Sequence, residues 1–102
     1  MTFAEFIAST ATDSSPPSRL PQALAALWHD RRGNWDVAHN LAQAAGGKDG
    51  AWVHAYLHRK EGDEGNAAYW YRSAGRPETT NSIDEEWENI TRALLSETKT
   101  GK

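Results

Sequence analysis

Four glycines in two matching pairs constrain the fold of this chain more than any other feature. Gly33 and Gly46 recur as Gly62 and Gly75 when the sequence is shifted by 29 residues. Each glycine follows a segment whose apolar residues recur every three or four positions. Glycine is also the residue that most readily takes the left-handed conformation at a helix end. The pattern predicts four helices, arranged as two copies of one helical hairpin.

Further identities fall within the same shift. Small residues at matching positions let paired helices approach closely, and one hairpin cannot bury its own apolar face. The second hairpin is therefore expected to stack on the first. The additional pairs are Ala26 with Ala55, His29 with His58, Ala38 with Ala67, and Ala45 with Ala74.

The helix boundaries follow from local signals. Helical periodicity begins near Leu20, and Asn34 is positioned to cap the second helix. A third helix is predicted from about Gly50 to Glu61, and Asp63 is positioned to cap the fourth. Residues 1–19 are expected to be a lead-in segment with one short amphipathic turn.

The C-terminal segment carries the clearest helix signature. Ser82 and Glu85 have the spacing of a capping box, and a narrow apolar stripe follows them. The prediction is a helix over 82–98 that covers the exposed end of the stack. The helical domain then spans residues 20–98, with a frayed tail over 99–102. The stripe consists of Ile83, Trp87, Ile90 and Leu94.

The second hairpin resembles a tetratricopeptide-type repeat. The residues that carry the resemblance are Gly62-Asp63, Asn66-Ala67, Tyr69-Trp70-Tyr71, Ala74 and Pro77. Because the period is shorter than the 34 residues of a standard repeat, the likeness is to a shortened, Sel1-like hairpin over about residues 20–77. The stretch also resembles small bacterial proteins of uncharacterised function. The resemblance implies an all-α fold of two stacked antiparallel hairpins with a C-terminal capping helix, and it supplies no mechanism.

Composition narrows the classes of function. The formal net charge is −3 and no basic stripe appears, so a nucleic-acid partner is not expected. The chain has no cysteine, which excludes disulfides and thiolate chemistry. The N-terminus lacks the pattern of a secretory signal or a membrane-spanning helix, so the expectation is a cytoplasmic protein without a membrane partner. No cofactor is indicated.

Histidines form the most specific candidate site. His54 and His58 lie four residues apart on one predicted helix, which is the spacing that helical metal sites use for two ligands. Their face is predicted to point away from the core, and His29, at the position matching His58, is expected on the same side. The ordinary alternative is a solvated helix face, or hydrogen bonding to an acid such as Glu61.

Aromatic residues at helical spacing are expected in the core, and Tyr69 points away from them as a candidate for an exposed contact. The acidic run Asp84-Glu85-Glu86 fits a solvated first turn that favours the helix dipole. The residues predicted for the core are Trp35, Trp52, Tyr56, Trp70 and Tyr71.

Two functions remain open at this point. The favoured one is a small non-catalytic module that binds a protein or peptide, or a second copy of itself, through a groove lined by the first helices. The alternative is a metal-binding or histidine-based enzyme that uses His29, His54 and His58. No nucleophile motif or phosphate-binding loop is present. The candidate binding surface comprises His29, Arg32, His54, His58, Glu61 and Tyr69.

Overall fold

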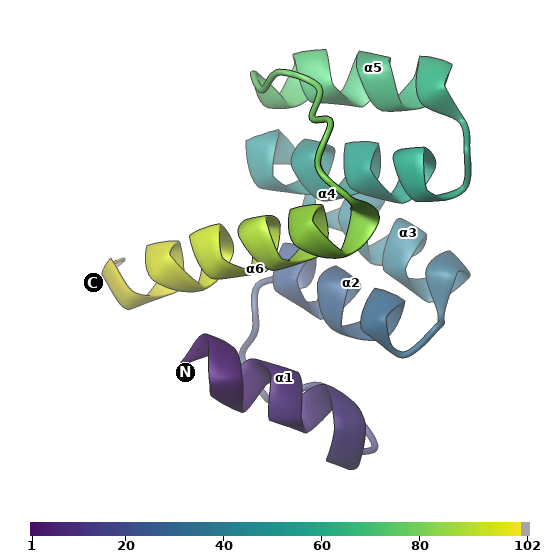
Figure 1. Ribbon diagram of the computed structural model, residues 1–102. Helices are drawn as coiled ribbons and strands as arrows, with labels where there is room; N and C mark the ends of the chain where they lie inside the picture. Colours follow the sequence, from purple (N-terminus) through teal and green to yellow (C-terminus); the bar gives the residue numbers. More distant parts are fainter. Residues whose placement is uncertain (101–102) are drawn as a thin grey trace.

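The computed structural model describes residues 1–100 of the chain, and the side chains of residues 1–97. All secondary structure in this part is helical, as predicted (Figure 1). The six described helices are α1 (Phe3–Thr12), α2 (Gln22–Arg31), α3 (Trp35–Ala45), α4 (Gly47–Lys60), α5 (Glu64–Ala74) and α6 (Ile83–Thr100).

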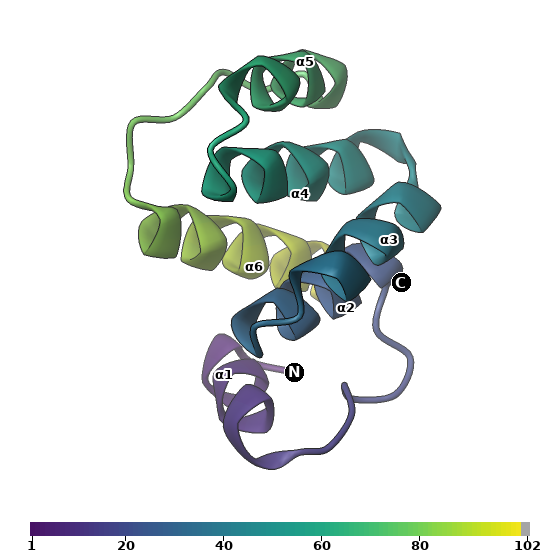
Figure 2. The ribbon, with the colours of Figure 1, turned by 90° about the vertical axis from the view of Figure 1, so that its right-hand side faces the viewer.

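The helices are layered around α4. Helices α2 and α3 pack against each other, as do α4 and α5, and α3 also packs on α4. Helix α5 lies at one end of the molecule and α1 at the other, with α4, α6 and the α2–α3 pair between them (Figures 1 and 2). As a result α4 packs against α2, α3, α5 and α6.

The position of α4 explains the location of the core. Eight consecutive residues of this helix, 50–57, are buried, although an amphipathic surface helix buries only one stripe. At Gly50 a Cβ atom would stand 2.8 Å from the carbonyl oxygen of Ala42, so glycine permits the close crossing of α3 and α4. Helix α4 begins at Gly47, three residues before the predicted start.

The N-terminal segment forms a complete helix where the sequence pattern predicted one short turn. Thr2 and Glu5 form a reciprocal capping box at its start. Phe6 is fully buried, and the rings of Phe3 and Phe6 both lie with their centroids 6.1 Å from that of Trp87 in α6. The prediction underestimated this helix because the apolar surface that stabilises it lies far along the chain.

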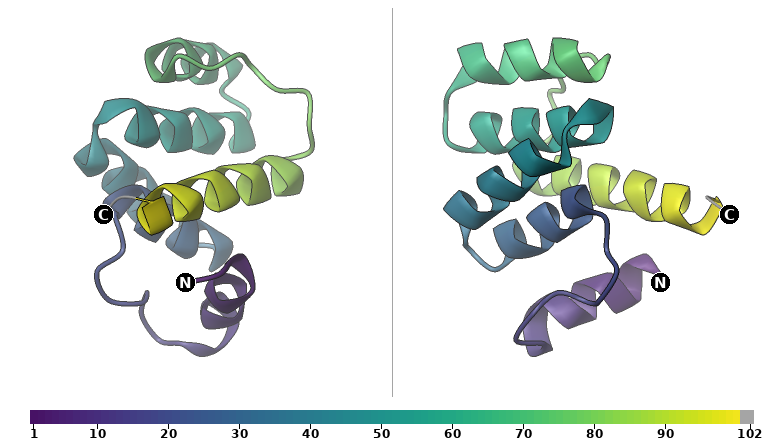
Figure 3. Two further views of the ribbon diagram at one scale, coloured as in Figure 1. Left: turned by 90° about the vertical axis from the view of Figure 1, so that its left-hand side faces the viewer. Right: turned by 180° about the vertical axis from the view of Figure 1, so that it is seen from behind.

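Helix α6 has the predicted capping box and buried stripe, but its position corrects the prediction. Ser82 and Glu85 exchange hydrogen bonds of 3.0 and 3.1 Å, and Trp87 donates from Nε1 to the Leu27 carbonyl oxygen at 3.0 Å. The helix packs on α1, α2 and α4, below α4 and away from α5 (Figure 3). It therefore covers the first helix of each pair instead of the α5 end of the stack.

Local predictions at the other helix ends mostly hold. Gly33 and Gly62 both have positive φ angles, 84° and 88°, in the turns that follow α2 and α4. Asp63 accepts a hydrogen bond from the Asn66 amide, whereas Asn34 occupies the N-cap position without a side-chain cap. Helix α6 continues to Thr100, and residues 101–102 of the predicted tail lie outside the described residues.

Candidate metal site

Three histidines converge where α3 crosses α4. His54 and His58 lie one helical turn apart on α4 and project from the same face. His39 projects toward them from α3, the helix that Gly50 allows to approach closely. One ligating nitrogen from each of the three imidazoles can be chosen so that all lie within 4.8 Å of one another.

Aromatic rings enclose this three-histidine cluster. The centroids of the His39, His54 and His58 rings are separated by 4.6 to 5.2 Å. Trp35 stacks on His39 at 4.9 Å, and its Nε1 donates to the Leu57 carbonyl oxygen, which fixes its orientation. Trp70 of α5 stacks on His54 at 4.0 Å. Two tryptophan faces thus form apolar walls on either side of the imidazoles.

The imidazoles differ in their polar partners. His58 Nδ1 lies 2.7 Å from Glu61 Oε2, so its Nε2 is the nitrogen left to bind elsewhere. Within the described part of the chain, the His39 and His54 imidazoles make ring contacts and no hydrogen bond. His54 is nevertheless only 3% exposed. Its nitrogens still keep some access to the surface, because the one fully enclosed side-chain atom without a partner in the described structure is His29 Nδ1.

Burial and mutual repulsion keep two of these imidazoles neutral. Burial is the main cause that lowers the pKa of His54 to about 4, and the nearby His39 and His58 lower it further. The pKa of His39 is also lowered, first by burial and then by His58, against the opposing effect of Glu61 and Asp36. At neutral pH, His39 and His54 therefore carry free lone pairs, which is the state that coordinates a metal.

A cleft of about 440 Å³ opens beside His54, between α3, α4 and α5. His54 and Trp70 form one part of its wall. The remaining lining residues are Ala42, Gln43, Gly46, Gly47, Lys48, Gly50, Ala51 and Ser73.

The structure corrects two of the histidine predictions. His54 is buried, because the face of α4 that was expected to meet solvent is covered by α3 and α5. His29 is half-buried beside Trp28 at 5.1 Å and does not belong to the group of three. His39 takes its place. Sequence reasoning missed His39 because the 29-residue shift aligns it with Ala68, so no second histidine marked the position. The spacing of four residues between Trp35 and His39 was the available signal, since it puts both on one face of α3.

The other predicted surface residues lie in different surroundings. Arg32 extends over Trp28 and donates to the backbone carbonyls of Thr10 and Asp13, which ties α2 to α1. Glu61 pairs with His58. Tyr69 is 54% exposed, as predicted, and its ring meets Trp70 edge-on. Trp52, Tyr56 and Tyr71 are buried as predicted, whereas Trp35 and Trp70 are half-buried against the histidines.

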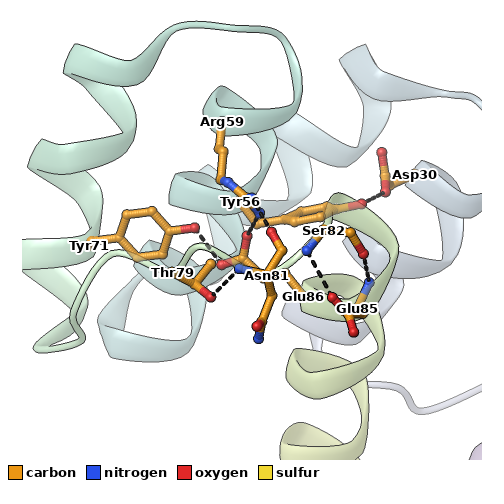
Figure 4. A network of polar contacts seen from close by, with 9 residues as sticks. All are labelled: Asp30, Tyr56, Arg59, Tyr71, Thr79, Asn81, Ser82, Glu85 and Glu86. Carbon is orange, nitrogen blue, oxygen red and sulfur yellow. Dashed lines mark hydrogen bonds and ion pairs between the residues drawn. The ribbon is translucent and has the colours of Figure 1, made fainter.

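A second polar cluster joins α2, α4, α5 and α6 (Figure 4). Asp30 accepts from the Tyr56 hydroxyl at 2.7 Å and from Lys60 Nζ at 2.9 Å. Glu86 accepts from Arg59 at 2.8 Å and from the Tyr71 hydroxyl. Burial, followed by these carboxylates, raises the pKa of both tyrosines far above its usual value.

Glu86 is another correction, because the acidic run was expected to be solvated. Asp84 and Glu85 are exposed, but Glu86 is buried. Its carboxylate faces α4 and α5, where Arg59 and Tyr71 compensate for its desolvation. The second cluster is fully partnered, so we assign it a structural role.

Comparison with protein-family models, curated proteins and solved structures finds no match to this chain. None of the described helices has the length and apolar character needed to cross a lipid bilayer.

Proposed function

We propose that the protein binds one divalent transition-metal ion through His39, His54 and His58. The observation that carries the proposal is the convergence of three ligating nitrogens from two helices within 4.8 Å. Nitrogens around a tetrahedral zinc ion stand roughly 3.3 Å apart, given zinc–nitrogen bonds of about 2.0–2.1 Å. Small rotations of the three rings are therefore enough to close the site.

The donor chemistry supports a metal from the zinc, nickel and copper range. Imidazole suits these ions, whereas calcium and magnesium prefer oxygen ligands. Glu61 holds His58 through Nδ1, which is the common way a carboxylate orients a metal-binding imidazole. A bound ion would also satisfy His39 and His54, which lack hydrogen bonds in the described structure.

Metal titration tests this proposal directly. We expect metal-free protein to bind one equivalent of Zn²⁺ by calorimetry, and one of Co²⁺ with visible absorption typical of nitrogen coordination. His39→Ala and His54→Gln should each weaken binding by at least about 10-fold, the loss expected for disturbing a metal site.

His29→Ala is the matched control, because His29 is a half-buried histidine outside the cluster. It should bind metal as the wild type does, and circular dichroism should confirm that all variants are folded. Absence of stoichiometric binding to the folded wild-type protein would overturn the proposal, as would equal weakening by His29→Ala.

We also propose that α2–α5 are two copies of a 29-residue, tetratricopeptide-like hairpin. The helix bounds support the repeat, since α4 ends 29 residues after α2, at Lys60 against Arg31. Helix α5 begins and ends 29 residues after α3, at Glu64 against Trp35 and Ala74 against Ala45. The packing of α2 on α3 and of α4 on α5 is compatible with stacked hairpins.

A second candidate function is interaction with a protein partner or self-association. The groove expected along the first helices is occupied by α6, which packs on α2 and α4. The support comes instead from the second helices, where Val37 and Tyr69 are 43% and 54% exposed. If these residues form the contact, light scattering should detect oligomers that Tyr69→Ser weakens and Arg72→Ser, on the same helix, leaves intact. A strict monomer at millimolar concentration would contradict self-association.

A further inference from the structure

A cleft adjoins the proposed metal site at His54, the one histidine of the cluster among its lining residues. His54 belongs both to the three-histidine cluster and to the wall of the cleft. His54 is only 3% exposed, and its imidazole has no hydrogen-bond partner in the described structure. The cleft therefore reaches a polar side chain whose lone pair is free.

The cluster leaves a coordination position open. Of the side chains that the structure describes, only three histidines come together here, whereas zinc and cobalt take at least four ligands. Glu61 and Asp63 group with His58 alone, so neither joins His39 and His54. Three neutral imidazoles bring no negative charge into direct contact with a divalent ion, and the nearest carboxylate, Glu61, is bonded to His58. A fourth ligand that carries negative charge is accordingly favoured.

The lining of the cleft matches an organic anion. Lys48 contributes an ammonium group that pairs with no carboxylate in the described structure. Its Nζ stands 3.9 Å from the position that a Gly75 Cβ would occupy, so the side chain extends toward the end of α5. Trp70, Ala42 and Ala51 supply apolar surface in the same cleft, which a bare inorganic ion would leave unused.

The volume of the cleft is suitable for a small organic anion. At about 440 Å³ the cleft lies toward the small end of the range of ligand sites, which is roughly 300–1,000 Å³. It can accommodate a carboxylate with a short hydrocarbon or aromatic portion.

We propose that the metal-loaded protein binds a small carboxylate in this cleft. One carboxylate oxygen occupies the open position on the metal, Lys48 attracts the negative charge, and the apolar portion packs beside Trp70. This inference rests on the proposed metal function and adds the chemical class of the ligand.

Titration of Co²⁺-loaded protein with acetate and benzoate tests the inference, because cobalt absorption responds to a change of its ligands. The buffer should be non-coordinating. We expect a saturable spectral change at one carboxylate per chain, with benzoate binding at least about 10-fold more tightly than acetate. Trp70→Leu should reduce the preference for benzoate.

Lys48→Met should weaken both carboxylates by about 10-fold. Arg72→Met is the matched control, since Arg72 is an exposed cation on α5 outside the lining of the cleft. It should leave carboxylate affinity unchanged within about twofold.

The outcomes separate the two proposals. If the protein fails to bind Co²⁺, the metal function itself is wrong. If Co²⁺ binds but carboxylates leave its spectrum unchanged, the metal function stands and the ligand inference fails. Two further outcomes would overturn the assignment to this cleft. One is a spectral response that Lys48→Met and Arg72→Met alter equally, and the other is equal affinity for acetate, phosphate and benzoate.

Discussion

In the cluster that joins α2, α4, α5 and α6, two buried carboxylates each have a cation and a tyrosine hydroxyl as partners. Where α3 crosses α4, three imidazoles lie together, and among the described residues a carboxylate is hydrogen-bonded to His58 but not to His39 or His54. Both clusters bury polar groups within the same small helical protein. They differ in whether the protein itself satisfies those groups.

The difference separates a structural cluster from a candidate binding site. Asp30 and Glu86 use their lone pairs within the fold, so they hold α2, α4, α5 and α6 together and have little capacity left for a ligand. The imidazoles of His39 and His54 keep their lone pairs free behind tryptophan walls. Neutral imidazole nitrogens that have no partner within the fold are available to bind a metal ion.

Removing one carboxylate should have the largest effect. In Glu86→Ala, Arg59 and the Tyr71 hydroxyl lose their buried acceptor, so we expect the free energy of unfolding to fall by about 3–5 kcal/mol in urea denaturation. Glu88→Ala is the control, since the Arg92–Glu88 pair is 57% and 46% exposed and should contribute less than about 1 kcal/mol. Equal losses in the two variants would refute the structural role of Glu86.

Acid should destabilise the three-histidine cluster of the metal-free protein. The pKa of His54 is about 4 in the folded state against 6.5 for the unfolded reference, so between these values the unfolded state binds more protons. Stability is therefore complete above pH 6.5 and falls as the pH drops toward 4, by up to about 3 kcal/mol at 1.36 kcal/mol per pKa unit. His54→Gln should flatten this part of the curve of unfolding free energy against pH, and an unchanged curve would contradict the assignment.

Metal binding to the three-histidine cluster should stabilise the folded protein. At a free Zn²⁺ concentration of 100 times Kd, binding to the folded state alone raises the free energy of unfolding by about 2.7 kcal/mol. Denaturation with and without a chelator should show this gain in the wild type and in His29→Ala, and its loss in His39→Ala. If the chelator has no effect on the zinc-treated wild type, the site does not stabilise the fold.

The smallest of these effects concerns a single hydroxyl. Tyr56→Phe removes the hydrogen bond to the buried Asp30 carboxylate and should cost about 1.5 kcal/mol or slightly more. Tyr69→Phe makes the same chemical change at a side chain that is 54% exposed, and should stay within about 0.5 kcal/mol. Thermal denaturation of the two variants compares these losses. Similar shifts in melting temperature would show that the hydrogen bond from Tyr56 to Asp30 does not stabilise the fold.

Some parts of the fold were predictable because their causes are local. The capping box of Ser82 and Glu85, the cap at Asp63 and the turn at Gly62 depend on residues within a few positions of one another. The full length of α1 was not predictable in this way, because Phe3 and Phe6 are stabilised by Trp87 near the other end of the chain.

The candidate site was predictable only in part. The spacing of His54 and His58 placed two candidate ligands on one helix face, and the two side chains do lie together in the structure. The predicted third histidine was wrong. The 29-residue repeat favoured His29, whereas the crossing of α3 over α4 brings His39 to the other two. Spacing along a helix specifies which side chains share a face, but it does not specify which other helix approaches that face.

The sequence by itself therefore determined that α2–α6 are helical, several of their ends and the pair of histidines on α4, since backbone propensity and helical periodicity act over a few residues. Only the tertiary structure decided that α4 is enclosed by α2, α3, α5 and α6, which buries His54 and Glu86 and gives them opposite roles. The physical reason is that burial depends on what packs against a face. Burial then decides whether a polar side chain needs a partner within the protein or remains available to a ligand.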